Sequence, residues 1–480
     1  MLTYSFENIG KESLYQHLYN CIKNDILQGT LSEGYKLPSK RSFAKHLNIS
    51  TITIETAYNN LLSEGYIYSI PKKGYYVAEI SNVFNTPYSN PINTRAHFTS
   101  NNSDNTQKTK NYIANFNSNQ TNPDNFPFSI WAKLLREVIN NYRSELMINS
   151  PFGGIIELRE AIANHLYNYR GISVSPEQII IGAGTEYLYG LLIQLLGRDK
   201  IYAIENPSYK KIGKIYTKNN ISTKYITVEN NGISLEELYT SNANILHISP
   251  SHHFPSGVVT PISRRYKILQ WAAKNSERYI IEDDYDSEFR FIGKPIPTLQ
   301  SIDNNEKVIY INTFSKSLTS TIRISYMILP PHLLQKYQDE LSFYSCTVST
   351  FEQYTLAKFI NNGYFEKHIN RMRTYYKNLR NKILQCIKQS PIKSQIKITE
   401  KDSGLHFLIE INNRLTDTQI KKRAENLNIN VSFLSEYYNN PIKKIHNNPI
   451  LVINYSGIKP EDINNYIELL CNCIDNKVDK

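Results

Sequence analysis

The lysine best placed for chemistry, Lys316, closes the segment Thr313-Phe314-Ser315-Lys316, directly after the β-rich run 308–311. Arg323 comes seven residues later. A lysine at a strand end, among hydroxyl groups and an arginine, can form a Schiff base with an aldehyde while its neighbours hold a phosphate. This segment is a weak signal by itself, because a surface lysine would look the same.

A second segment, 280–285, reads as a buried strand that ends in carboxylates. Pyridoxal phosphate (PLP) requires an acid beside its pyridine nitrogen, because the protonated ring acts as an electron sink. Asp283 suits that role, and Tyr285 is placed to hydrogen-bond the phenolic oxygen of the ring. The alternative is a metal site whose ligands would be Asp283, Asp284, Asp286 and Glu288. A hard metal ion at this site would leave Lys316 without a role.

Two further segments suit the same cofactor. The turn Gly182-Ala183-Gly184-Thr185 precedes a helix, so its small residues can expose backbone N–H groups to a phosphate. In Asn206-Pro207-Ser208-Tyr209, the tyrosine follows another β-rich run and can stack on a cofactor ring. Each signal is weak alone, but their order along the chain is consistent.

The elements that must position these residues alternate from about residue 126 to the end. Helical patterns cover 130–142 and 157–169, and short β-rich runs cover 179–181, 200–204, 244–248, 278–281 and 308–311. Such alternation predicts an α/β fold, in which helices cover a mostly parallel sheet.

Residues 1–80 read as a separate small domain. A first amphipathic helix repeats apolar residues every four positions, at Leu14, Leu18, Ile22 and Ile26. Ser39 can cap a second helix. A third helix is predicted to turn one apolar face toward the core. The residues of that face are Ile54, Ala57, Tyr58, Leu61 and Leu62. The β-rich runs 66–70 and 75–78 then form a hairpin with a basic tip, Pro71-Lys72-Lys73-Gly74.

This order of elements is the plan of a winged helix-turn-helix that reads double-stranded DNA. The third helix would enter the major groove, with Thr51, Thr53, Thr56 and Asn60 on its polar face. Arg41 and the wing lysines, Lys72 and Lys73, can meet phosphates, and Gly74 allows a close approach. The alternative is a helical dimerisation module with a solvated face.

Composition limits the function classes. The 480 residues carry a net charge of +11, yet residues 1–80 hold 8 Lys and Arg against 7 Asp and Glu, so DNA binding depends on where charges lie. The five cysteines include no CxxC pair, which favours free thiols and no metal site. We expect no signal peptide, no membrane span and a cytoplasmic protein. Residues 81–125, rich in Asn, Ser and Thr, are expected to form a flexible linker between domains 1–80 and 126–480.

The segment LPSKRSFAKHLNISTITIETAYNNLLSEG, residues 37–65, resembles the GntR family of repressors. The family's Pro-Ser-x-Arg motif matches residues 38–41, so the resemblance adds Ser39 to the DNA-binding set. The family's Ser-Arg-x-Thr-Val turn reads Ser50-Thr51-Ile52-Thr53-Ile54 here. Because Thr51 replaces an arginine, one phosphate or guanine contact of the family is in doubt, whereas the fold is not.

Residues 112–480 resemble the fold-type I aminotransferases, and the combination with a GntR-type module is similar to the MocR subfamily of transcription regulators. Matching phrases are SPSHHFPSG at 249–257, RYIIEDDYDSEF at 278–289, NTFSKSL at 312–318 and SGLHF at 403–407. The resemblance implies that Lys316 bonds the cofactor aldehyde, Asp283 meets its pyridine nitrogen, Tyr285 its phenolic oxygen and Tyr209 its ring face. It places Ala183, Gly184, Thr185, Thr313 and Arg323 around the phosphate, with Asn206 and His252 nearby, and it implies a head-to-tail homodimer.

The chain departs from these aminotransferases near its C-terminus. They hold the substrate carboxylate with an arginine, whereas the matching stretch 451–457 contains none and no arginine follows Arg423. Lys459 could substitute only as a point charge. Two hypotheses follow. One is a regulator that senses PLP or an amine, with vitamin B6 synthesis as a candidate pathway; the other is an aminotransferase with an accessory DNA-binding module.

Overall fold

The chain folds into two compact units, residues 1–108 and 109–480. The computed structural model describes residues 2–6, 12–79, 112–117, 121–291, 293, 296–399, 404–439 and 448–475. Each unit is described by itself.

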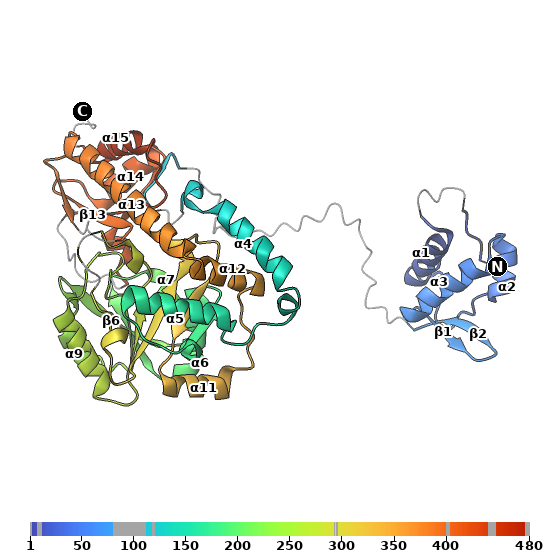
Figure 1. The fold of residues 1–480 in the computed structure, drawn as a ribbon. Helices are drawn as coiled ribbons and strands as arrows, with labels where there is room; N and C mark the ends of the chain where they lie inside the picture. The colour runs from blue at the N-terminus through green and yellow to red at the C-terminus, as the bar shows by residue number, and fades with distance from the viewer. Residues whose placement is uncertain are drawn as a thin grey trace. The chain divides into compact units, whose positions relative to one another are not determined.

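The small unit has the predicted three helices and hairpin (Figure 1). Its elements are α1 (Leu14–Leu27), α2 (Lys40–Leu47), α3 (Thr51–Ser63), β1 (Ile67–Ile70) and β2 (Gly74–Val77). The Ser39 side chain accepts a hydrogen bond from the backbone N–H of Ser42, which confirms the predicted cap of α2. One apolar core unites all three helices with the hairpin, so the polar end of α3 is held on a fixed scaffold.

Two residues expected on apolar faces of this unit are exposed. Leu14 is the first residue of α1 and is 43% exposed, so the buried stripe of that helix begins only at Leu18. Leu62 is 37% exposed, because it lies about 100° around the helix from Leu61, which faces the core. Each predicted apolar face therefore included one residue, Leu14 or Leu62, that the structure leaves exposed.

An eight-stranded sheet forms the centre of the large unit. In spatial order it is β4 (Ile179–Gly182), β11 (Ser325–Ile328), β10 (Val308–Thr313), β9 (Tyr279–Asp283), β8 (Ile245–Ile248), β5 (Ile201–Asn206), β6 (Ser222–Glu229) and β7 (Gly232–Ile233). The neighbours from β10 to β6 pair in parallel, while β4 and β10 are each antiparallel to β11. The predicted α/β fold with a mostly parallel sheet is confirmed.

This topology gathers the predicted chemistry at one edge. Since β4 and β10 are both antiparallel to β11, they point the same way as the parallel strands. The C-terminal ends of six strands therefore share an edge, at Gly182, Asn206, Glu229, Ile248, Asp283 and Thr313. The carboxyl edge of such a sheet is where ligands bind in α/β proteins.

Helices surround this sheet, as the alternation predicted. They are α4 (Phe128–Asn141), α5 (Ile156–Arg170), α6 (Thr185–Leu196), α7 (Lys210–Lys218), α8 (Leu235–Thr240), α9 (Ile262–Ala273), α10 (Phe314–Ser317), α11 (Pro331–Leu341), α12 (Thr350–Asn361) and α13 (Tyr364–Gln389). Short 3₁₀ turns are η1 (Pro123–Asn125), η2 (Glu145–Met147), η3 (Pro176–Gln178), η4 (Ser287–Phe289), η5 (Gln300–Ile302) and η6 (Leu434–Tyr437).

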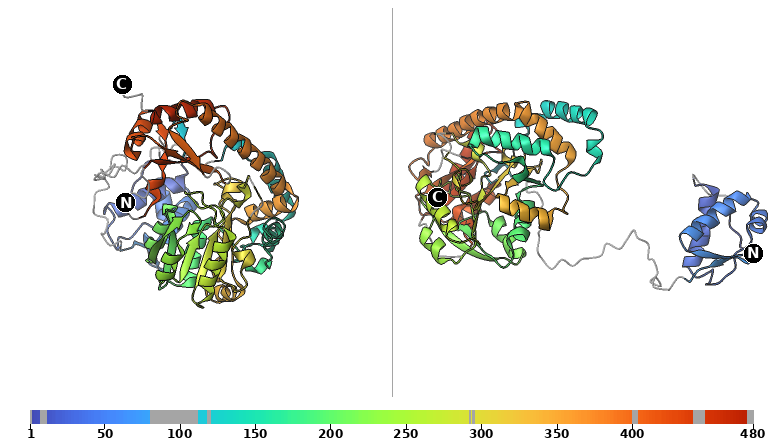
Figure 2. Two further views of the ribbon diagram at one scale, coloured as in Figure 1. Left: turned by 90° about the vertical axis from the view of Figure 1, so that its left-hand side faces the viewer. Right: turned by 60° about the horizontal axis from the view of Figure 1, so that its bottom comes forward.

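The C-terminal part of the large unit adds a smaller antiparallel sheet (orange to red in Figure 2). Its order is β12 (Ile396–Thr399), β13 (His406–Ile411), β16 (Ile450–Asn454) and β15 (Ser432–Phe433), with helices α14 (Asp417–Asn426) and α15 (Ile463–Ile474). A separate core joins these elements to α13. No helix within the described ranges is long and apolar enough to span a membrane.

The large unit begins before the boundary expected at residue 126. The pair β3 (Ala114–Asn115) and β14 (Ile429–Asn430) runs in parallel, and Phe116 is fully buried in the C-terminal core. Residues 112–117 and 121–125 therefore belong to this unit rather than to the linker. A two-residue strand in an Asn-rich segment gives too short a pattern to detect. Residues 81–111 and 118–120 of the expected linker lie outside the described residues.

Candidate functional site

A cavity of about 310 Å³ lies at the edge where the strands end. It brings together seven of the residues singled out in the sequence, namely Thr185, Tyr209, Asp283, Tyr285, Thr313, Lys316 and Arg323. These seven come from five different segments of the chain, and the fold brings them together at one cavity.

Lys316 lies on α10, the single helical turn that follows β10. Burial lowers the pKa of its ammonium group to about 8, and the Asp286 carboxylate opposes that effect. About a tenth of the amine is then neutral at pH 7, against well under a thousandth for an ordinary lysine. Only a neutral amine attacks an aldehyde, so burial favours the form of this lysine that could bond an aldehyde.

Asp283 is the last residue of β9 and is 6% exposed. Its Oδ2 accepts a hydrogen bond of 2.5 Å from the Tyr189 hydroxyl, and His247 Nε2 lies 3.7 Å from the same oxygen. Its Oδ1 is buried and has no hydrogen-bond partner among the described residues. A buried carboxylate oxygen in that state fits a ligand that brings a proton, such as a protonated ring nitrogen.

Tyr285 completes the ring side of the cavity. Burial, followed by the charges of Asp286 and Asp283, raises the pKa of Tyr285 well above its ordinary value. The phenol therefore stays protonated and can donate a hydrogen bond. Its oxygen lies 3.3 Å from His252 Nδ1, and that same nitrogen is 2.8 Å from Asp286 Oδ2.

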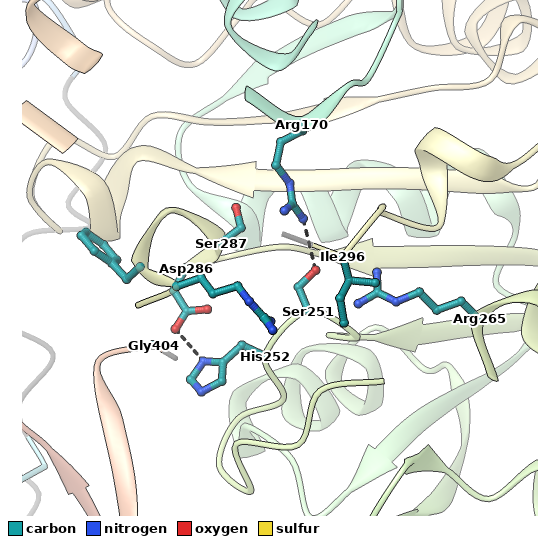
Figure 3. Close-up of a pocket in the computed structure, with 10 residues that line it drawn as sticks. Arg170, Ser251, His252, Arg265, Asp286, Ser287, Ile296 and Gly404 are labelled. Atoms are coloured by element: carbon teal, nitrogen blue, oxygen red, sulfur yellow. Dashed lines mark hydrogen bonds and ion pairs between the residues drawn. The ribbon is translucent and has the colours of Figure 1, made fainter. Parts of the chain in front are cut away.

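His252 lines a smaller, adjacent cavity of about 20 Å³ rather than the main one (Figure 3). The figure shows His252 and Asp286 facing each other beside Gly404, and Arg170 directed at Ser251. His252 is thus connected to the main cavity through its contact with Tyr285, and its place near a cofactor stays a prediction.

One acid of the alternative metal site, Asp284, has buried protein partners. Asp284 forms a buried ion pair of 2.7 Å with Arg170, and its carboxylate also accepts the Tyr310 hydroxyl. Both the Arg170 cation and the hydrogen bonds lower the pKa of Asp284 against the effect of burial. These contacts give Asp284 a structural role beneath the cavity floor.

Gly184, the start of α6 and the Arg323 guanidinium lie together beside the cavity. Gly184 has φ +90°, and a Cβ atom there would overlap the Arg323 guanidinium. Arg323 itself has φ +52° and directly precedes the strand segment leading into β11. The first turn of α6 begins at Thr185 and leaves backbone N–H groups without helical partners. A glycine, a helix N-terminus and a guanidinium together suit a phosphate.

Two residues predicted near the cofactor, Ala183 and Asn206, form hydrogen bonds within the protein. The backbone N–H of Ala183 donates a hydrogen bond to Thr347 Oγ1, at 3.0 Å, and its predicted place at the phosphate stays a prediction. Asn206 Oδ1 accepts the backbone N–H of Asn439, at 3.1 Å, and Ser208 also contacts the C-terminal part through Tyr437. Asn206 thus ties the edge of the large sheet to the C-terminal segment and does not line the cavity.

Tyr209 lines the cavity mouth with its side chain 45% exposed. Its ring meets Phe254 edge-on, with centroids 6.1 Å apart. The aromatic face that the sequence predicted is therefore available at the cavity, and Phe254 supports it from the side.

Sequence reasoning missed several cavity residues, among them Tyr189, Ser249, Phe254, Ser315 and Ser320. Tyr189 had a detectable signal, because it stands one helical turn after Thr185 and so shares its face of α6. Ser249 directly follows β8, in the same way that Asp283 ends β9. Phe254 had no signal of its own in the sequence.

The stretch that lacks the expected arginine contains β16. Val452 is 2% exposed and packs with Leu408, Leu434 and the ring of Phe254, which itself lines the cavity. The described cations that line the cavity are Lys211, Lys316 and Arg323. The stretch that lacks the arginine thus packs in an apolar cluster, which reaches the cavity through Phe254.

The small unit presents the residues predicted to meet DNA. Arg41 and Thr51 are exposed, at the starts of α2 and α3. The Ser50 side chain caps α3 by accepting the backbone N–H of Thr53, at 3.1 Å. At the wing tip, Lys72 and Lys73 are exposed, and Lys72 and Gly74 have positive φ angles of 63° and 117°. The wing therefore turns tightly around its basic residues.

Comparisons with known proteins agree with both units. Residues 14–77 match the family "Bacterial regulatory proteins, gntR family", and residues 112–468 match "Aminotransferase class I and II". A Bacillus subtilis relative, the uncharacterized HTH-type transcriptional regulator YdeL, is 36% identical over 95% of this chain and 96% of its own. The pyridoxine biosynthesis transcriptional regulator PdxR of Corynebacterium glutamicum is 26% identical over 89% of each chain.

The fold of the large unit is that of solved aminotransferases. A Pyrococcus horikoshii kynurenine aminotransferase aligns with a TM-score of 0.66 and 23% identity, over 75% of this chain and 90% of its own. The rhizopine catabolism regulator MocR of Rhizobium meliloti is 29% identical over 95% of this chain and 93% of its own. The chain therefore belongs to the MocR-type transcription regulators of the GntR family, in which a helix-turn-helix domain precedes an aminotransferase class I and II domain.

Proposed function

We propose that this regulator binds PLP covalently on Lys316, and that occupancy of the cavity changes how the small unit binds promoter DNA. The observation that carries the proposal is a single cavity. It combines a lysine with a pKa of about 8, a buried carboxylate oxygen without a partner and a glycine–arginine cradle. Aldehyde, ring nitrogen and phosphate are the three features of PLP that such a site would meet.

The roles follow from the geometry of the chain's own groups. Lys316 would supply the amine, Asp283 Oδ1 would accept a hydrogen bond from the protonated ring nitrogen, and Tyr285 would donate one to the phenolic oxygen. Thr185, Thr313 and Arg323, with Gly184, would hold the phosphate, and Tyr209 would cover the ring. When bound, PLP supplies an aldehyde that reacts with amines and a ring that withdraws electrons.

We assign the cavity to sensing rather than to rapid amino-group transfer. The apolar packing around Val452 offers no guanidinium to hold a substrate carboxylate in a fixed orientation. The ligand that carries the signal would then be PLP itself or an amine that reacts with it. The resemblance to a regulator named for pyridoxine biosynthesis supports control of vitamin B6 synthesis as the pathway.

Promoter DNA is the proposed partner of the small unit. Arg41, Lys72 and Lys73 would contact phosphates, with Gly74 allowing the approach, and the start of α3 at Thr51 and Thr53 would face base edges. Ser39 caps the N-terminus of α2, and we expect that terminus to lie near the sugar-phosphate backbone of the DNA. The family resemblance supports a head-to-tail homodimer, and free cysteines suit the cytoplasm.

A matched pair of glycine variants tests the phosphate cradle. Gly184→Ala places a Cβ against the Arg323 guanidinium, so we expect PLP affinity to fall about tenfold, the equivalent of one lost charged hydrogen bond. Gly190→Ala lies in the same helix with nothing within 4 Å of the new methyl group, and should bind PLP as the wild type does. Equal PLP affinities of the two variants, measured by fluorescence titration, would refute the cradle.

Lys316→Ala tests the covalent bond. Reconstituted wild type should absorb near the boundary of the visible and ultraviolet, and the variant should lack that band. With a pKa of about 8, the amine gains its neutral form with rising pH. The rate at which the band appears should therefore rise about tenfold per pH unit below 8 and level off above it.

The control for this measurement is Lys214→Ala, which removes an exposed lysine of α7 and should keep the band. A band that persists in Lys316→Ala contradicts the assignment. A rate that keeps rising toward pH 10.5 would show instead that the reacting amine is an ordinary solvated lysine.

Arg41→Ala tests the DNA contact. The variant should weaken binding to all duplexes alike and reduce the dependence of log K on log salt by about 1, because one phosphate contact is lost. Arg41→Lys keeps the positive charge and should restore most of the slope. Fluorescence anisotropy over a series of salt concentrations measures both. An unchanged slope in Arg41→Ala would show that Arg41 meets no phosphate.

A further inference from the structure

An isoleucine projects from the first turn of the helix that would enter the major groove. Ile52 is 74% exposed, the highest value for a large apolar side chain in the described part of the small unit. The core face of α3 is formed by other residues, namely Ile54, Ala57, Tyr58 and Leu61. Ile52 therefore contributes nothing to the core of its own unit.

The rest of this surface of α3 offers little charge. The helix, TITIETAYNNLLS, contains no lysine or arginine. Its acid, Glu55, is paired with Lys40 of α2 at 2.7 Å. Because Lys and Arg are the usual partners of guanine in the major groove, this helix is poorly equipped to read guanine.

The threonine hydroxyl groups near the N-terminal end of α3 already form hydrogen bonds within the protein. The Thr56 hydroxyl donates to the carbonyl of Ile52, at 2.9 Å, and the Thr53 hydroxyl lies 3.0 Å from that of Ser50. Ile52, Thr56 and Asn59 are spaced by four and three residues, so they share one helical face. Along that face, apolar methyl groups come first and an exposed amide follows two turns later.

Position distinguishes Ile52 from an ordinary exposed apolar residue, which is common on protein surfaces. In a helix-turn-helix, the N-terminal residues of the recognition helix are those that reach base edges. Phosphate contacts from Arg41 and from the wing lysines would fix the register of that helix on the duplex. The thymine 5-methyl group is the apolar feature of the major groove.

We infer that Ile52 contacts the 5-methyl group of a thymine, so that each operator half-site carries A·T pairs where the start of α3 meets the bases. This inference rests on the proposed DNA binding and adds the chemistry by which sequence is read. Ile52 is then a specificity-determining residue, and Asn59 is placed to meet an adenine edge one or two base pairs along.

Deoxyuridine tests this contact, because it differs from thymidine only by the missing methyl group. The full chain is first used to select duplexes from a randomised library. The selected duplex is then resynthesised with one thymidine at a time replaced by deoxyuridine. We expect the wild type to bind about fourfold more weakly at one or two positions in each half-site, the effect of burying one methyl group.

Ile52→Ala should bind the thymidine and deoxyuridine duplexes with equal affinity at those positions. Leu62→Ala, which shortens another exposed apolar side chain of α3, should keep the wild-type difference. A wild type that is indifferent to every deoxyuridine, or an Ile52→Ala variant that retains the fourfold difference, overturns the inference while leaving DNA binding intact. A chain that shows no salt-dependent binding to any duplex overturns the proposed DNA binding itself.

Discussion

Burying a carboxylate in a protein is costly unless its oxygens are paired, and Asp283 meets this constraint only halfway. Tyr189 donates to one oxygen, while the other oxygen is left without a hydrogen bond among the described residues. The large sheet places Asp283 at the end of β9, next to the strand that leads to Lys316. A ligand that brings a protonated nitrogen to that oxygen completes the arrangement. The pocket, the lysine and the anion cradle are organised around this requirement.

The same burial has opposite effects on the two groups that would hold PLP. It depresses the pKa of Lys316 and so makes the amine reactive, and it raises the pKa of Tyr285 and so preserves a hydrogen-bond donor. Around them, buried contacts such as Arg170 with Asp284 hold the loops after the strands in place. The apolar packing around Val452 adjoins the cavity through Phe254. Under the proposed function, such a site would report whether the cofactor is bound.

Much of this site could be predicted because its residues follow strands, and parallel strands end at a common edge. Asp283, Lys316 and Thr185 stand out in the sequence for that reason. Tyr189 was missed although it shares the face of α6 that carries Thr185, and Phe254 was missed because its place depends on a loop. The contact of Asn206 with Asn439 joins residues far apart in the chain, and no local pattern encodes it. Phe116 was assigned to a linker because a single buried aromatic gives no periodicity.

A regulator of this kind requires that the two units influence each other, and such coupling must be reciprocal. The most direct measurement is the affinity of the full chain for the DNA upstream of its own gene, with and without saturating PLP, in the wild type and in Lys316→Ala. The account predicts that PLP changes the DNA affinity of the wild type severalfold, that DNA changes PLP affinity by the same factor, and that Lys316→Ala loses both effects. A wild type whose DNA affinity is identical with and without PLP would contradict it.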